Sequence, residues 1–294
     1  MNALLSALRI PPRGRVAPGA PAPPRCTVRP MTSPFADDIR LAHVLADAVD
    51  QHTMSRFKAQ DLRVEEKPDL TEVTDADRTA EQMIRSQLAR SRSRDQVIGE
   101  EFGSTGHASR QWVIDPIDGT SNFVRGVPVW ATLIGLVEDG EVVMGLVSAP
   151  ALGKRWWAGQ GSGAWTGSRL SSATHIRVSA VDDIADASLS YSSLHGWAEH
   201  DRLPQMLNLM QRFWRTRAYG DFWSYMLLAE GAVDVACEPE LNLHDMVALV
   251  PIVTEAGGRF TSLDGEAGPF GGNAVVTNGR LHEEVLEALA LRER

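Results

Sequence analysis

An apolar strand that ends in a carboxylate-rich turn is the feature that most restricts what this chain can fold into. It occupies residues 112–120, where a Trp-Val-Ile run meets Asp115 and Asp118. Pro116 between them cannot donate to a β-sheet and biases the preceding residue away from a helix. We therefore expect both carboxylates on a turn at a strand end. Two hard oxygen ligands placed in this way suit Mg²⁺, which binds a few carboxylates and keeps waters in its other positions.

Gly119 and Thr120 follow the carboxylates directly. Their amide groups are able to face an anion that shares the metal, because backbone N–H groups in turns and at helix starts form anion-binding concavities. The turn therefore predicts a phosphate site next to a metal. A purely structural role for Asp115 and Asp118 is the weaker alternative, because this spacing of Asp, Pro and Gly at a strand end is specific.

Other carboxylates lie where further predicted elements begin or end. Glu100 and Glu101 follow a predicted strand over residues 96–98. Asp75 and Asp77 stand at the start of one predicted helix, and Asp245 opens another over residues 245–256, which Gly257-Gly258 ends. Each has an ordinary alternative role. Asp75 and Asp245 are suited to helix capping, and the two glutamates are suited to a solvated loop.

The composition limits the class of partner. The chain has 294 residues, 43% of them hydrophobic, and a net charge of −9. This acidity argues against nucleic-acid binding, which needs a basic patch, whereas a phosphate substrate is compatible because a bound metal supplies positive charge. No apolar run approaches the ~18 residues that span a bilayer, so we expect no membrane partner. Cys26 and Cys237 are too few for a disulfide framework or a thiolate metal site.

We expect three segments along the chain. Residues 1–32 are rich in Pro and Arg and are predicted to be a disordered extension, with a targeting peptide as the alternative. Residues 33–180 are predicted to form an α+β half that binds the metal, with a hairpin turning at residues 139–140. Residues 181–294 alternate strands with helices, which predicts an α/β half that binds the substrate.

Three separated motifs resemble the inositol monophosphatase family of Mg²⁺-dependent, lithium-sensitive phosphatases. They are Gly99-Glu100-Glu101, the stretch from Trp112 to Phe123, and Thr254-Glu255-Ala256-Gly257-Gly258. The spacing from Glu238 to Asp245 also fits, and the resemblance covers roughly residues 35–290. It implies a layered α-β-α-β-α sandwich, a homodimer, and a small phosphate ester as substrate.

The resemblance also implies a metal centre. The ligands it implies for a first Mg²⁺ are Glu100, Asp115 and the carbonyl of Ile117, and those for a second are Asp115, Asp118 and Asp245. Asp75 matches a position near a third, weaker ion. Thr120 matches the residue that orients the attacking water together with Glu100, and Gly119 and Thr120 would bind the phosphate.

Substrate residues are expected in a different part of the chain. Residues 122–130, 155–158 and 217–222 resemble the actinobacterial histidinol-phosphate phosphatases of this family, which implies L-histidinol phosphate as substrate. The residues expected to contact it are Asp118, Arg217, Asp221 and Glu238. Asp221 has helix capping as an alternative role, and inositol 1-phosphate or a sugar phosphate is the alternative substrate.

His244 departs from the family pattern, which usually has Trp immediately before the last metal-binding Asp. We expect a satisfied or solvent-facing imidazole there, with contact to the substrate or to a divalent ion as the alternative. The resemblance otherwise implies a cytoplasmic enzyme of histidine biosynthesis.

Overall fold

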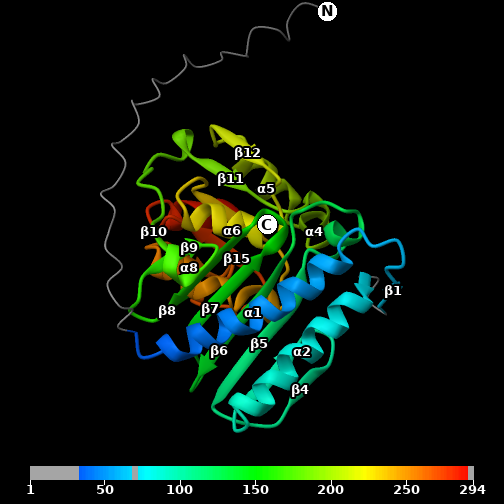
Figure 1. Ribbon diagram of the computed structural model, residues 1–294. Coiled ribbons are helices and arrows are strands. Elements are labelled where there is room, and N and C mark those ends of the chain that lie inside the picture. Colours follow the sequence, from blue (N-terminus) through cyan, green and yellow to red (C-terminus); the bar gives the residue numbers. More distant parts are fainter. Residues whose placement is uncertain (1–32, 68–71, 291–294) are drawn as a thin grey trace, which may run out of the picture. The chain divides into compact units, whose positions relative to one another are not determined.

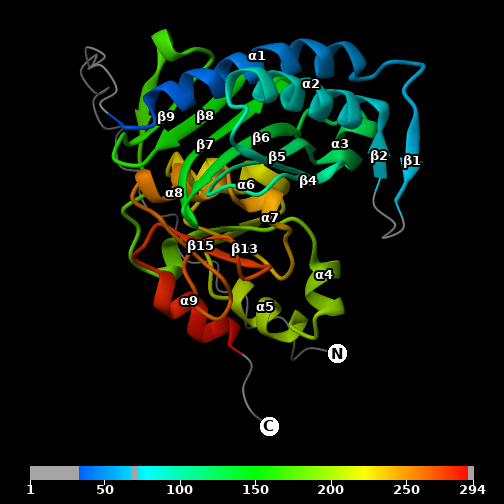
Figure 2. The ribbon, with the colours of Figure 1, turned by 90° about the horizontal axis from the view of Figure 1, so that it is seen from below.

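The computed structural model describes residues 33–67 and 72–290. The extension expected over residues 1–32 lies outside these ranges. Two β-sheets alternate with layers of helix (Figure 1), and Figure 2 shows the order helix, sheet, helix, sheet, helix from top to bottom. This is the α-β-α-β-α sandwich that the sequence predicted. None of the helices in the described ranges is long and apolar enough to cross a membrane.

The larger sheet has eight strands and is built mainly from antiparallel neighbours. In order across the sheet they are β10 (Thr174–Ile176), β9 (Ala164–Gly167), β8 (Lys154–Gly159), β7 (Glu141–Ala149), β6 (Ala131–Glu138), β5 (Arg110–Asp118), β3 (Gln96–Gly99) and β4 (Gly103–Thr105). The predicted hairpin joins β6 to β7. Asp139 and Gly140 have φ angles of 51° and 85°, as a two-residue turn with left-handed central residues requires.

The smaller sheet has five strands, with parallel pairing on one side and antiparallel pairing on the other. Their order is β12 (Arg215–Arg217), β11 (Ser188–Ser190), β13 (Val235–Glu238), β15 (Ala274–Thr277) and β14 (Arg259–Thr261). A separate two-stranded hairpin pairs β1 (Val64–Glu66) with β2 (Glu72–Thr74). The two main sheets fall on either side of residue 180, while the division into two domains there stays a prediction.

Helices cover the outer face of each sheet and fill the space between them (Figure 2). The outer layer on the larger sheet consists of α1 (Ala36–Arg56) and α2 (Asp75–Ser91). The middle layer, between the sheets, consists of α6 (Asp221–Ala229), α7 (Leu243–Met246) and α8 (Leu249–Glu255). The outer layer on the smaller sheet consists of α4 (Leu194–Glu199), α5 (Leu203–Met210) and α9 (His282–Leu289). The short helix α3 (Thr120–Val124) follows β5 directly.

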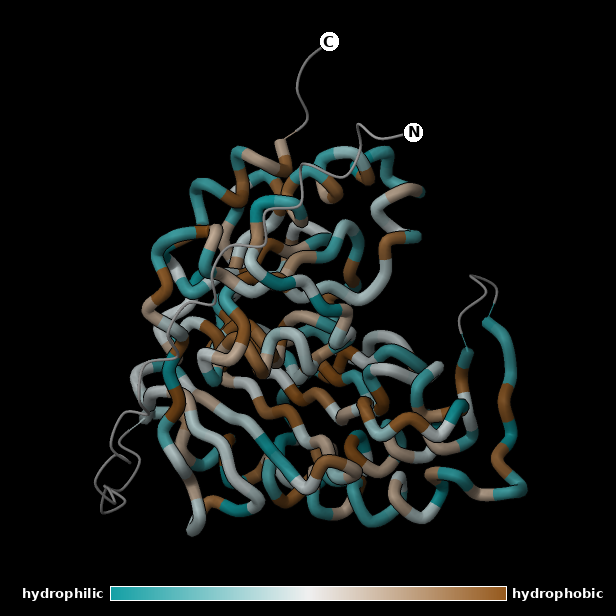
Figure 3. The backbone as a smooth tube through the Cα atoms, turned by 90° about the horizontal axis from the view of Figure 1, so that it is seen from above, coloured by the Kyte–Doolittle hydropathy of each residue, from teal (hydrophilic) through white to brown (hydrophobic). Residues whose placement is uncertain are grey.

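The apolar core is divided by the sheets, because successive side chains of a strand point to opposite faces. Trp156 and Trp157 on β8 are both buried, and they pack into different clusters. The alternation of side chains along a strand therefore places both tryptophans in the core, on opposite faces of the sheet. Figure 3 shows hydrophobic segments concentrated along the inner strands and helices, with hydrophilic turns at the periphery.

Candidate metal and phosphate site

The predicted carboxylate turn lies at the end of β5. The register of β5 with β6 shifts between Asp115 and Asp118, which is a bulge of the kind that redirects side chains beside functional sites. Asp115 is 2% exposed, and its Oδ1 accepts the amide of Ile117 at 3.0 Å. The local sequence therefore both forms the turn and orients its first carboxylate.

Gly119 joins this turn to α3 and must be glycine. Its φ is +84°, a region that favours glycine, and a Cβ would lie 2.9 Å from the carbonyl oxygen of Val129. Thr120 then starts α3, and its hydroxyl lies 2.9 Å from the carbonyl oxygen of Ile117 and 3.2 Å from Asp77 Oδ1. Gly119 and Thr120 both line the cavity, as a phosphate-binding role requires.

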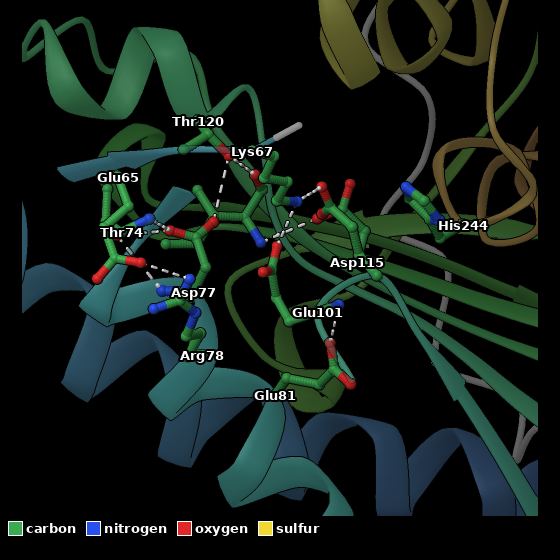
Figure 4. Close-up of polar contacts among 12 residues, drawn as sticks. Glu65, Lys67, Thr74, Asp77, Arg78, Glu81, Glu101, Asp115, Thr120 and His244 are labelled. Carbon is green, nitrogen blue, oxygen red and sulfur yellow. Dashed lines mark hydrogen bonds and ion pairs between the residues drawn. The ribbon is translucent and has the colours of Figure 1, made fainter. Parts of the chain in front are cut away.

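The partner of Thr120 corrects a prediction. We expected the Thr120 hydroxyl to act with Glu100, but the carboxylate at Thr120 is Asp77, which is fully buried near the start of α2. Asp77 also accepts the amide and hydroxyl of Thr74, which caps the helix (Figure 4). Burial raises the pKa of Asp77 to about 6. Glu100 instead contacts Lys67.

Asp75, expected near a third metal, does not lie with these carboxylates. Its Oδ2 pairs with Arg56 at 3.0 Å, and its Oδ1 accepts the amide of Arg63 at 3.3 Å. It does not cap the helix either, because Thr74 has that role. The difference follows from the helical period: Asp77 shares the buried face with Ala80, Glu81, Ile84 and Leu88, and Asp75 does not. Extending that apolar stripe backward by three residues would have identified Asp77.

The Glu100 turn is held from beneath by α2. Glu81 is fully buried, and its carboxylate accepts the amides of Glu101 at 2.7 Å and Phe102 at 3.2 Å. A Cβ on Gly99 would lie only 2.0 Å from this carboxylate, so a larger residue there would displace Glu81 from its two amide contacts. Above the turn, the Lys67 ammonium contacts Glu100 at 2.6 Å and Glu101 at 2.7 Å (Figure 4). Glu100 is therefore positioned by two segments distant in sequence.

Asp245 comes from the layer between the sheets. It is the third residue of α7, whose cap is Asn242, rather than the residue that opens the helix. Asp245 Oδ2 accepts the Asn242 amide at 2.7 Å. The single helix expected over residues 245–256 is two shorter helices, α7 and α8, and α8 ends near the expected Gly257-Gly258 pair.

Two groups of side chains bring possible metal ligands together. In each group, ligand atoms lie within 4.8 Å of one another, and the groups are Asp115, Asp118 and Asp245, and Glu100, Asp115 and His244. Asp115 belongs to both, which matches a shared ligand. Ile117 also lines the cavity, and its carbonyl oxygen lies 2.9 Å from the Thr120 hydroxyl oxygen.

The electrostatics of these residues fit a cation. Burial, together with the charge of Glu100, raises the pKa of Asp115 well above its usual range. Burial and the charge of Asp221 do the same for the pKa of Asp118, and burial raises the pKa of Asp245. Buried carboxylates that repel one another are stabilised in their charged form by a bound metal ion. The oxygen donors are those that Mg²⁺ prefers.

The opposite wall of the cavity is formed around the start of α6. Asp221 has a φ of +48°, lies on the wall, and accepts the side-chain amide of Asn122 at 2.7 Å. Burial raises the pKa of Asp221 to about 6. It is not the helix cap, which is Gly220; instead the amide of Phe222 donates to Asp118 across the cavity at 2.7 Å. The expected place of Asp221 in the site is therefore compatible with the structure.

Two other expected substrate contacts are not on the cavity wall. Glu238 is 6% exposed and accepts the amide of Ser192 at 2.6 Å, so it supports the wall from behind. Burial raises the pKa of Glu238 to about 8. Arg217 is exposed at the end of β12, and its guanidinium donates to the carbonyl of Thr216. A sequence pattern locates these residues near the site, but only packing decides which of them face inward.

The cavity has a volume of about 500 Å³. Its lining consists of Glu72, Glu100, Asp115, Ile117, Asp118, Gly119, Thr120, Ser121, Asn122, Ser192, Ser193, Ala218, Tyr219, Gly220, Asp221, Asn242, His244 and Asp245. The expected satisfied or solvent-facing state of His244 is only partly met, because the side chain is 20% exposed and lies against the carboxylates.

The model of the inositol monophosphatase family matches residues 36–293. The chain belongs to the inositol monophosphatase family. A histidinol-phosphatase from Streptomyces coelicolor is 61% identical over 262 residues, which are 88% of this chain and 98% of the relative. A histidinol-phosphatase from Mycobacterium tuberculosis is 56% identical over 254 residues, 86% of this chain and 98% of the relative.

Solved structures of the family share the fold. An inositol monophosphatase from Zymomonas mobilis is 33% identical with a TM-score of 0.78, over 88% of this chain and 100% of that one. An IMPase from Thermotoga maritima is 32% identical with a TM-score of 0.77, over 86% and 96% of the two chains. The family is metal-dependent, in agreement with the ligand groups of the cavity.

Proposed function

We propose that this chain is a Mg²⁺-dependent phosphatase that hydrolyses L-histidinol phosphate to L-histidinol and phosphate. The observation that carries the proposal is the identity of 61% and 56% to two proteins named histidinol-phosphatase, over 98% of the length of each. The carboxylates of the cavity and the acidic wall at Asp221 support the same reaction and substrate.

Two Mg²⁺ ions would be held by the ligand groups that share Asp115, with Glu100 in one group and Asp118 and Asp245 in the other. When bound, the ions would neutralise the charge of the phosphate monoester and favour attack by water. The carbonyl of Ile117 would be a further ligand of the first ion, because Ile117 lines the cavity.

Thr120 and Asp77 would position the attacking water. The Thr120 hydroxyl can accept a hydrogen bond from water while it donates to Asp77 Oδ1, which is 3.2 Å away. A proton from the water then passes through the hydroxyl to the buried carboxylate, whose pKa of about 6 suits a base near neutral pH. The amides of Gly119 and Thr120 would bind the phosphate oxygens.

Asp221 would recognise the cationic part of the substrate. Histidinol carries an ammonium group and an imidazole, and a partly buried carboxylate forms strong charge-assisted hydrogen bonds with such groups. Tyr219 also lines the cavity and offers an aromatic face for stacking. A neutral polyol phosphate would leave the Asp221 carboxylate without a cationic partner.

Phosphate release from L-histidinol phosphate and from inositol 1-phosphate, each with and without Mg²⁺, tests the proposal. We expect Mg²⁺-dependent release that strongly favours histidinol phosphate. Asp221→Asn should lower this preference about ten- to a hundredfold by raising the KM, since one charged contact is worth about 1.5–3 kcal/mol. Inositol 1-phosphate is the substrate for comparison because a Thermotoga maritima relative named fructose-1,6-bisphosphatase/inositol-1-monophosphatase is 35% identical to this chain. Release from inositol 1-phosphate alone would overturn the substrate assignment.

We further propose a cytoplasmic homodimer that acts in histidine biosynthesis. The dimer and the compartment follow from the family resemblance, and the pathway follows from the substrate. Light scattering on the full chain tests the dimer, and growth without added histidine after deletion of the gene tests the pathway.

A further inference from the structure

His244 gives one of the two ligand groups a nitrogen donor. It is the second residue of α7, directly before Asp245, and it lines the cavity. One of its ring nitrogens lies within 4.8 Å of ligand oxygens of both Glu100 and Asp115. Figure 4 shows its ring beside Asp115, at the edge of the carboxylate cluster.

The two ligand groups therefore differ in chemistry although they share Asp115. The group with Asp118 and Asp245 offers carboxylate oxygens alone, whereas the group with Glu100 adds an imidazole. Oxygen ligands suit Mg²⁺, while imidazole suits first-row transition ions such as Zn²⁺, Fe²⁺ and Ni²⁺. Lys67 contacts Glu100 through Oε1, but a carboxylate has several lone-pair sites and can bind an ion as well.

We propose that His244 is a nitrogen ligand at the Glu100 site, so that this site prefers a transition ion and the Asp118–Asp245 site prefers Mg²⁺. The inference deepens the proposed function, since both concern the same cavity. It goes beyond the family resemblance because His244 is the position at which this chain departs from it. The competing role for His244 is to orient Asp245, whose Oδ1 lies 3.4 Å from Nε2, too far for a good hydrogen bond.

Pulsed electron paramagnetic resonance of bound Mn²⁺ tests this directly, because a ¹⁴N nucleus bonded to Mn²⁺ modulates the echo. The full chain is stripped of metal with a chelator and loaded with a single molar equivalent of Mn²⁺. We expect ¹⁴N modulation in the wild type and its loss in His244→Gln. His195→Gln is the matched control, because His195 is exposed and pairs with Glu199, and it should keep the modulation.

Titration calorimetry supplies a second measurement on the same variants. In His244→Gln we expect the Zn²⁺ dissociation constant to rise at least about tenfold, as loss of a group that supports a metal site does. The Mg²⁺ dissociation constant should change much less, because an oxygen-preferring ion gains little from imidazole. Circular dichroism verifies that the variant is folded.

The inference is overturned if the wild type shows no ¹⁴N modulation, or if the modulation persists in His244→Gln. Equal loss of Zn²⁺ and Mg²⁺ affinity would overturn it too, since that result assigns His244 to the orientation of Asp245. These outcomes are separable from the proposed function. Hydrolysis of histidinol phosphate without ¹⁴N modulation refutes only the assignment of His244 as a nitrogen ligand. Conversely, ¹⁴N modulation without hydrolysis of histidinol phosphate refutes only the substrate assignment.

Discussion

The two walls of the cavity carry similar side chains but are assembled in different ways. The metal wall, residues 115–120, comes from one strand end, its bulge and the first residue of the next helix. The substrate wall, Ser192 and residues 219–221, is joined by contacts between segments far apart, such as the Asn122–Asp221 hydrogen bond across 99 positions. A short sequence can specify the first wall. The second depends on how the two sheets pack on the helices between them.

The largest effect is expected from Asp118→Asn on the metal wall. The variant removes a charge from the oxygen-only ligand group, so kcat/KM should fall roughly a thousandfold or more, as loss of several kcal/mol of transition-state stabilisation requires. Asparagine keeps an oxygen for the Phe222 amide, so circular dichroism should be unchanged. Asp139→Asn in the β6–β7 turn is the control. Unchanged turnover in Asp118→Asn would refute the metal assignment.

A somewhat smaller effect is expected from Thr120→Val. The substitution nearly keeps the shape of the side chain but removes the hydroxyl between the water and Asp77, so kcat should fall roughly a hundredfold with little change in the affinity for Mg²⁺. Asp77→Asn should have a similar effect, and the double variant should be little worse than either, because the two residues act as a unit. Additive losses would show that they act separately.

On the substrate wall, Glu238→Gln tests whether the buried Glu238 carboxyl, which accepts the Ser192 amide, contributes to the stability of the fold. The pKa of Glu238 is about 8 in the folded chain against an ordinary 4.5, so the folded state holds the proton more tightly than the unfolded state. Its contribution to stability is present below pH 4.5 and is lost as the pH rises toward 8, by about 1 kcal/mol per pH unit.

Urea unfolding of the metal-free protein between pH 4.5 and 8 measures this loss. Glu238→Gln should flatten the decline in the free energy of unfolding. Glu240→Gln is the matched control, since the Glu240 side chain is 72% exposed. A decline as steep in Glu238→Gln as in the wild type would contradict the protonated state of this carboxyl.

The smallest effect is expected from Asp75→Asn, which is close to the metal wall in sequence but outside the cavity lining. The change weakens a partly exposed pair with Arg56, so the free energy of unfolding should fall by about 0.2–1 kcal/mol. Turnover and its dependence on Mg²⁺ should stay as in the wild type. A weaker Mg²⁺ affinity in this variant would restore Asp75 to a third metal site.

Prediction from sequence succeeded where neighbouring residues settle the geometry. The hairpin at residues 139–140 and the helix stop near residues 257–258 lie where expected, because Pro, Gly and alternating apolar residues restrict the backbone locally. The carboxylates Asp115 and Asp118 lie at the expected end of a strand, but on a bulge within β5 rather than on a turn after it. Prediction from sequence failed to decide whether Asp75 or Asp77 lies at the site. Both are acidic residues at the start of one helix, and only the period of the buried face distinguishes them.

The sequence by itself determined the candidate metal and phosphate site at residues 115–120, because Pro116 and Gly119 restrict the backbone at the end of a strand. Only the tertiary structure decided that the Thr120 hydroxyl lies next to Asp77. It also decided that Glu238 lies behind the cavity wall and that Arg217 lies outside the cavity. The same holds for His244, whose ring lies close to the carboxylates of Glu100 and Asp115. The physical reason is distance along the chain. Contacts between segments that are far apart in the sequence depend on how the layers pack and on the charges that this packing brings together. A local sequence pattern contains no information on either.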